Sequence, residues 1–276
     1  GGPRRLARAM ILIDEHLDDQ RRRLGLVQVG RGGLGQTGQN LIWRADISVM
    51  RGVLARDPEV VRESLAALGG TLPYAPGDKE GIKIDGSFHQ HGAQLMTGGY
   101  GLSYALDATR LAALVRGTQF ALSDEQLDGL TRFLLEGLRW AMRGSTLDYS
   151  TTGREFSRDM NTDRGRAVLE AIDYHLRHNL PEQADLRAWR DSIEHNTPVL
   201  RGDTRHYWQS DYAMHHADAL SLSLRMRSVR TLGSEQINRE GLQSLYFSDG
   251  VTFFYRDGSE YRDVFPLWNW RRVPGT

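Results

Sequence analysis

Apolar residues recur at helical spacing along the first two thirds of the chain, and the pattern changes to strand-like alternation near His206. Two expected helix starts carry further signals, because Pro58 suits the first turn of a helix and Ser123 with Gln126 forms a capping-box pattern. The spacing predicts helices over residues 4–24, 41–56, 58–69, 103–116, 123–143, 164–179 and 181–194.

The last part of the chain is expected to form strands. Residues 219–226 alternate apolar and polar side chains, which is typical of a half-buried strand. Residues 242–247 and 251–255, with a Ser-Asp-Gly turn between them, predict a β-hairpin. We therefore expect a multidomain α+β chain, with residues 1–205 helical and residues 206–276 the start of a β domain. About 70 residues rarely form a free-standing sheet domain with covered edges, so this domain looks truncated.

Composition excludes several classes of function. The formal net charge is zero, which gives no global field to attract nucleic acid, and no apolar run approaches the ~20 residues of a membrane span. The chain has no cysteine, so disulfides, thiolate metal sites and cysteine nucleophiles are excluded. Lys79 and Lys83 are the only lysines. The many arginines fit either a biased genome or recognition of carboxylate and sulfate groups.

The glycine-rich segment 85–101 holds the most reactive side chains, His91 and Tyr100. We expect irregular backbone here, which would hold a phenol on a loop beside an imidazole, a suitable pair for removing a proton from carbon. Each residue alone is more often structural. His89 and His91 could instead bind a metal ion, but alternate residues of extended backbone point to opposite faces, and no carboxylate is placed as a third ligand.

Three other segments carry polar candidates. Asn40 stands at the start of a predicted helix, where it would either cap the helix or donate to a substrate carboxylate. Arg154 and Arg158 lie four residues apart in a polar loop, as surface ion pairs or as an anion clamp. Glu235 and Asn238 lie in a loop after a predicted strand and indicate little by themselves.

Six short motifs bring these residues together in one order along the chain. They lie at residues 37–40, 85–101, 148–158, 230–238, 248–250 and 265–276. In this order and spacing they resemble polysaccharide lyase family 8, which contains chondroitin AC, hyaluronate and xanthan lyases, and the chondroitin AC lyases are the most similar. The resemblance implies an incomplete (α/α) toroid of helical hairpins, followed by the first strands of an antiparallel β-sandwich.

The resemblance also implies a reaction. A uronic-acid-containing polysaccharide of the chondroitin or hyaluronan class would be cleaved by β-elimination, without a cofactor or metal ion. Asn40 and His91 would neutralise the uronate carboxylate. Either His91 or Tyr100 could be the base, and Tyr100 is favoured because the group that takes the C5 proton must also return a proton to the leaving oxygen. Arg154 would favour the ionised form of Tyr100, and Glu235 would orient Arg154 or Tyr100. Weaker candidates for substrate binding are Arg158, Asn238, Trp43 and Trp208.

Aromatic side chains are expected to form a platform for sugar rings. Trp43, Tyr207 and Trp208 are the candidates, although Trp43 also suits a helix core, whereas Trp268 and Trp270 are expected to be packing residues. The implied partner is an acidic polysaccharide, with no nucleic acid and no membrane, and with a second chain or further segments of the same protein completing the fold. The resemblance implies a secreted or periplasmic bacterial protein.

Three alternatives stay open. The chain could be a xanthan-type lyase, or an inactive glycan-binding fragment. It could also be a toroid glycoside hydrolase that recruits two carboxylates from Asp85, Asp148 and Glu235. Absorbance from an unsaturated uronate product separates a lyase from a hydrolase.

Overall fold

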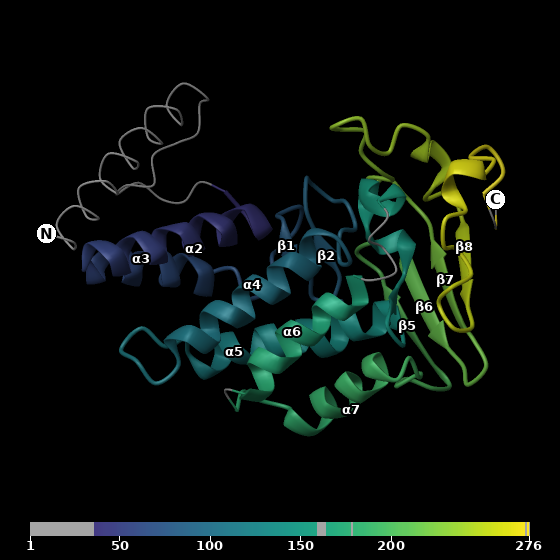
Figure 1. The fold of residues 1–276 in the computed structure, drawn as a ribbon. Coiled ribbons are helices and arrows are strands. Elements are labelled where there is room, and N and C mark those ends of the chain that lie inside the picture. The colour runs from purple at the N-terminus through teal and green to yellow at the C-terminus, as the bar shows by residue number, and fades with distance from the viewer. Residues whose placement is uncertain (1–35, 159–163, 178, 274, 276) are drawn as a thin grey trace, which may run out of the picture. The chain divides into compact units, whose positions relative to one another are not determined.

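A computed structural model describes residues 36–158, 164–177, 179–273 and 275, and residues 36–276 form one compact unit. In the described part, helices come first and a four-stranded sheet follows (Figure 1). The helices are α2 (Gly38–Ala55), α3 (Pro58–Gly69), α4 (Tyr100–Val115), α5 (Asp124–Arg132), α6 (Arg164–Arg177) and α7 (Gln183–Glu194). Helix α2 packs on α3 and α4, α4 on α6, and α6 on α7. The helix predicted at 4–24 lies outside the described residues.

Local signals explain where two of the helices begin. The Asp57 side chain caps α3 by accepting hydrogen bonds from the backbone of Glu59 and Val60. The predicted capping box of Ser123 and Gln126 is confirmed at the start of α5. None of the helices in the described part is both long and apolar enough to cross a membrane.

Helix α5 is shorter than predicted. It ends at Arg132 and continues as a π-helical segment (Phe133–Leu138), a 3-10 turn (Arg139–Ala141) and strand β3 (Met142–Arg143). A Cβ at Gly137 would lie 2.4 Å from the carbonyl oxygen of Gly86. The 85–92 loop therefore packs directly against this segment, and the wider π-helical turn accompanies that close approach.

The sheet is antiparallel, with strand order β5-β6-β7-β8. Its strands are β5 (Asp203–Tyr207), β6 (Tyr212–His216), β7 (Ser221–Arg225) and β8 (Val251–Tyr255). The strand predicted at 219–226 is confirmed as β7. The hairpin predicted between 242–247 and 251–255 is wrong, because β8 pairs with β7 and Ser244–Tyr246 is a 3-10 turn. The Phe247 ring, which follows this turn, stacks on that of Phe156 with 4.5 Å between centroids.

Short hairpins and turns connect the helices with the sheet. They are β1 (Gly81–Ile82) with β2 (Phe88–His89), β3 with β4 (Thr146–Leu147), and the 3-10 turns Tyr149–Thr151 and Gly153–Ser157. Buried carboxylates attach these connections to the strands. Asp85 Oδ2 accepts a hydrogen bond from the backbone of Gln209 at 2.6 Å. Asp148 accepts from the phenols of Tyr212 at 2.6 Å and Tyr255 at 2.9 Å.

A buried aromatic cluster lies against the inner face of the sheet. Trp268 and Trp270 pack against this cluster, which confirms the prediction that they are packing residues. Tyr207 belongs to the same cluster and donates a hydrogen bond to the carbonyl of Gly137 at 2.8 Å. The prediction that Tyr207 belongs to an exposed sugar platform is therefore wrong, because its ring is buried and its hydroxyl is occupied.

Candidate active site

Tyr100 is the first residue of α4, and the prediction that it lies on a loop is wrong. The irregular segment ends at Gly98 and Gly99, and the helix begins at once with a hydrogen bond from Ser103 N to Gly99 O. A Cβ at Gly98 would lie 2.4 Å from the Leu147 and Thr151 side chains, so glycine permits the close passage before the helix. Tyr100 is thereby held on a rigid element rather than a mobile one.

His91 lies on a loop in the left-handed backbone region, with φ 58°. Glu80 holds this loop from both sides, since its carboxylate accepts from Gly92 N at 3.1 Å and from Gln90 Nε2 at 2.6 Å. The Gln90 side-chain oxygen in turn accepts from the backbone of Gln39 at 2.9 Å. The His91 loop is therefore attached to the first turn of α2.

Arg154 lies at the centre of the site and contacts three of its other residues. Only 3% of this residue is exposed, and its guanidinium donates in three directions. Nη1 donates to Glu235 Oε1, Nη2 donates to the phenolic oxygen of Tyr100 at 3.3 Å, and Nε donates to Glu240 Oε2 at 3.0 Å. A guanidinium in this place stabilises negative charge on the Tyr100 oxygen.

Glu235 connects Arg154 to His91. Its oxygens lie 2.8 and 3.0 Å from His91 Nδ1. A carboxylate can only accept, so this contact assigns the proton to Nδ1 and leaves Nε2 for a ligand. The His91 and Tyr100 rings meet edge to face, with 4.9 Å between their centroids. Burial is the main cause that lowers the pKa of His91, and the charge of the Arg154 guanidinium lowers it further. The free imidazole is therefore neutral at neutral pH.

Trp43 of α2 lies near Tyr100, and Asn40 precedes Trp43 on the same helix. Asn40 is the third residue of the helix, and Thr37, rather than Asn40, occupies the N-cap position. No hydrogen bond to the Asn40 side chain is found among the described residues. Trp43 is 44% exposed, and its ring centroid lies 5.9 Å from that of Tyr100. Trp43 is therefore not a core residue, and Asn40 lies three residues earlier on the same side of the helix.

The remaining predicted residues divide into two groups. Arg158 joins the cluster indirectly, because it forms a two-point pair with Glu240 at 2.5 and 2.7 Å. Asn238 is exposed in a tight turn with φ 56°, and Trp208 is 48% exposed in the β5–β6 turn. Within the part of the chain that the structure describes, neither Asn238 nor Trp208 contacts Arg154.

Sequence reasoning missed three residues that hold this arrangement: Glu80, Glu240 and Arg225. Arg225 is 2% exposed and donates to the carbonyls of Ser150 and Gly233, which attaches the Arg154 segment to the Glu235 segment. Burial lowers the pKa of Arg225 to about 10, which still leaves a cation at neutral pH. No local signal identifies Arg225, because alternation groups it with Ser221 and Ser223 on the polar side of the strand, and only the structure shows that this side is buried.

Neither metal chemistry nor the hydrolase alternative gains support. Among the described residues, no group of three or more potential ligands could hold a metal ion. His89 is buried against Ser210 at 2.8 Å, and burial, followed by the charges of Lys83 and Arg225, lowers the pKa of His89 to about 3. A hydrolase needs a carboxyl group that can give up a proton. The candidates are already engaged, Asp85 and Asp148 in buried hydrogen bonds and Glu235 with Arg154.

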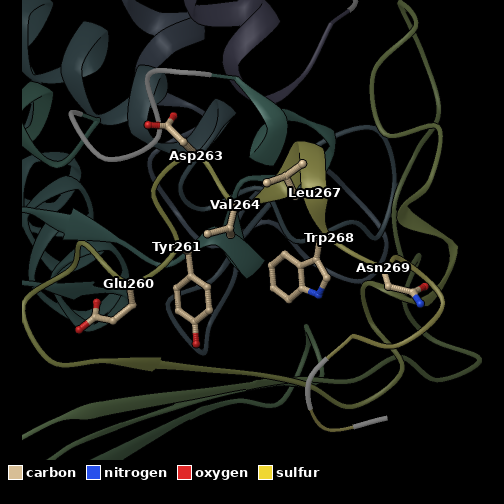
Figure 2. Close-up of a pocket in the computed structure, with 7 residues that line it drawn as sticks. All are labelled: Glu260, Tyr261, Asp263, Val264, Leu267, Trp268 and Asn269. Carbon is tan, nitrogen blue, oxygen red and sulfur yellow. The ribbon is translucent and has the colours of Figure 1, made fainter.

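A separate pocket of about 470 Å³ lies near the end of the chain. Figure 2 shows Tyr261 and Trp268 side by side in this pocket, and both rings contact Phe253 of β8. Its lining residues are Glu260, Tyr261, Asp263, Val264, Leu267, Trp268 and Asn269. None of the predicted site residues lines it, so it is distinct from the Arg154 cluster.

Two family models match this chain. Residues 2–195 match the N-terminal α-helical domain of polysaccharide lyase family 8, and residues 202–276 match the super-sandwich domain of the same family. The resemblance inferred from the six motifs is therefore confirmed, as is the fold of a helical part followed by the start of a β domain.

Individual relatives point to the same family. The chain is 35% identical over 202 residues to chondroitinase-AC of Pedobacter heparinus, covering 71% of this chain and 28% of that protein. It is 26% identical over 279 residues to hyaluronate lyase of Thermasporomyces composti, covering 87% of this chain and 36% of that protein. A chondroitinase AC lyase structure, solved with oligosaccharide complexes, has 29% identity and a TM-score of 0.79, covering 87% of this chain and 36% of that one. The chain thus spans about a third of the length of these relatives.

Proposed function

The chain belongs to polysaccharide lyase family 8, and from this premise we propose that it cleaves a uronic-acid-containing polysaccharide of the chondroitin or hyaluronan class by β-elimination. One observation carries the proposal. A single buried guanidinium, that of Arg154, contacts both the phenol of Tyr100 and the carboxylate of Glu235, and Glu235 holds His91. The names of the relatives, chondroitinase-AC and hyaluronate lyase, support the choice of substrate class.

Tyr100 is the proposed base and acid. Its oxygen acts as a phenolate that has first released its own proton to solvent; it takes the C5 proton of the uronic acid, the C4–O4 bond breaks, and a C4–C5 double bond forms. The same oxygen then returns the proton to O4, so no water is consumed. Arg154 donates to this oxygen at 3.3 Å and stabilises the negative charge that it carries once the phenol has lost its own proton.

Asn40 and His91 are the proposed partners of the uronate carboxylate. The C5 hydrogen is a weak acid while that carboxylate keeps its full charge, so hydrogen bonds that strengthen as the enolate forms lower the barrier. His91 Nδ1 is occupied by Glu235, which leaves Nε2 to meet the carboxylate. Because the proton of neutral His91 lies on Nδ1, Nε2 can donate to the carboxylate only after it binds a proton, and we infer that the negative charge of the bound uronate favours this protonation against the lowered pKa of the free imidazole.

The test is turnover of the full-length protein on hyaluronan, chondroitin sulfates and xanthan, each assayed separately by ultraviolet absorbance of the unsaturated product. Tyr100→Phe should lower kcat by about 10²–10⁴-fold, the range for a positioned acid–base group, and should leave oligosaccharide affinity nearly unchanged. Tyr174→Phe, on α6 and away from the cluster, is the matched control.

Three outcomes would contradict the proposal. Cleavage without the absorbing product would indicate a hydrolase, and binding without cleavage would indicate a glycan-binding module. Wild-type turnover in Tyr100→Phe would remove this residue from the mechanism. On the family alone, we also propose secretion or a periplasmic location, which fractionation of the source cells would test.

A further inference from the structure

The carboxylate of Glu240 lies between two arginines of the site. Its Oε2 accepts from Arg154 Nε at 3.0 Å and from Arg158 Nη2 at 2.7 Å, and its Oε1 accepts from Arg158 Nε at 2.5 Å. The hydrogen bond from Arg158 is the main cause that holds the pKa of the Glu240 carboxyl below its usual range. Burial opposes this lowering, and the charge of Arg158 and the contact with Arg154 add to it. Glu240 is therefore charged across the neutral range.

The chain is shaped to bring Glu240 to this place. Asn238 and Arg239 both adopt left-handed backbone, and Glu240 N donates to Ile237 O at 2.9 Å, which closes a tight turn. Gly241 follows with φ 67°, and a Cβ there would lie 2.4 Å from Glu235 O. The chain after Glu235 thus folds back on itself.

This turn places two carboxylates on different edges of one guanidinium. Glu235 takes the Nη1 group of Arg154 and Glu240 takes the Nε group, so only Nη2 remains to face Tyr100. A planar guanidinium held on two edges cannot rotate, and its third donor is then aimed in a fixed direction. With Glu235 alone, Arg154 could pivot about a single contact.

We propose that Glu240 is a positioning residue for the lyase reaction, which aims Arg154 at the Tyr100 oxygen and holds Arg158 in the same ion-pair network. This inference rests on the proposed function. Glu240 touches neither the substrate nor the reacting atoms in this scheme, so its effect is on kcat through Arg154. Its loss removes one of two acidic partners of Arg158, which is 39% exposed at its side chain and keeps its ion pair with Glu155 at 3.1 Å.

The test compares Glu240→Gln and Glu240→Asp with Asp211→Asn in the full-length protein. Asp211 anchors the same segment at its other end, through Arg230 at 2.6 Å and Thr231 at 2.8 Å, but contacts neither Arg154 nor Arg158 in the described part. We expect Glu240→Gln to lower kcat by about 10–100-fold, since a small misplacement of a catalytic group costs up to ~10²-fold. KM should stay equal or fall.

The conservative variant and the control complete the design. Glu240→Asp keeps the charge and should recover part of kcat, whereas Asp211→Asn should keep kcat within about threefold of wild type after correction for the folded fraction measured by circular dichroism. Equal losses in Glu240→Gln and Asp211→Asn would mean that Glu240 only anchors the loop, and an unchanged kcat in Glu240→Gln would overturn the inference. A wild-type protein without unsaturated product would refute the proposed function itself, which is a separate result.

Discussion

Replacing His89 with glutamine should remove part of the acid sensitivity of the fold. His89 is 2% exposed, lies two residues before His91, and has its Nε2 atom 2.8 Å from Ser210 Oγ. Burial is the main cause that lowers the pKa of His89 to about 3 in the folded chain, whereas the unfolded value is ~6.5. Glutamine can hydrogen-bond with Ser210 but does not titrate in this range.

The direction in which the free energy of unfolding changes with pH depends on which state, folded or unfolded, binds the proton. Between pH 6.5 and pH 3 the unfolded chain protonates His89 and the folded chain does not, so the free energy of unfolding falls as the pH falls through this window. The slope is at most about 1.4 kcal/mol per pH unit. With a folded pKa of about 3, the loss from this one group is about 2.5 kcal/mol between pH 6 and pH 4. Above about pH 8 the group contributes almost no pH dependence, because neither state then binds the proton.

The assay is urea unfolding at pH 6, 5 and 4 for the wild type and His89→Gln. The variant is expected to be less stable at pH 6, and the difference should shrink by about 2.5 kcal/mol at pH 4, because only the wild type loses stability through this histidine. His195→Gln, at an exposed position, controls for the loss of a histidine in general. If the free energy of unfolding changes equally with pH in the wild type and in His89→Gln between pH 6 and pH 4, the reasoning is refuted, since His89 would then have the same pKa in the folded and the unfolded chain.

Three further substitutions test the site. Asn40→Ala should lower kcat by about 10²–10³-fold, the usual effect of one lost oxyanion donor, without a change in melting temperature; a change in melting temperature alone would indicate a structural residue. Trp43→Ala should raise KM about fivefold with kcat retained, because stacking on the exposed indole is worth about 1 kcal/mol, and Trp43→Phe should recover part of the affinity. Arg225→Met should lower the free energy of unfolding by about 3 kcal/mol in urea titrations, and a cost under 1 kcal/mol would contradict its anchoring role.

The helical part of the fold could be predicted because its signals are local. Pro58 marks a helix start through its fixed backbone angle, and the pair Ser123 and Gln126 marks another through hydrogen bonds within one turn; both starts are observed. The end of α5 could not be predicted in this way. It depends on the close approach of Gly86 to Gly137, a contact between segments about 50 residues apart in the sequence.

In the strands, too, local pattern predicts some features, whereas others depend on contacts between distant segments of the chain. The strand at 219–226 was predicted from its alternation, but the structure buries its polar side, which is formed by Ser221, Ser223 and Arg225, and β6 likewise buries His216. Those polar side chains are acceptable only because partners elsewhere in the chain satisfy them. His216, for example, contacts Ser221 Oγ and the carbonyl of Trp140. Such partners are visible in the structure and not in the sequence pattern.

Among the site residues, resemblance to a family was more informative than pattern. His91, Tyr100, Arg154 and Glu235 were selected from separate motifs, and the structure brings these four together. Glu240 was missed because a glutamate after a turn has no local signature. Its role follows only from the fold-back at Gly241, which no periodicity encodes.

The site depends on how the helical part and the sheet are joined. His91, Tyr100 and Arg154 precede the sheet, whereas Glu235 follows β7, so the cluster exists only when the two parts are in register. Arg225 maintains that register, because it binds carbonyls of both the Arg154 and the Glu235 segments inside the protein. A buried cation adds little net stability, but leaving its carbonyl partners unpaired is costly, so such contacts favour one arrangement over its neighbours. Substitutions at these internal contacts should therefore change turnover without touching the sugar.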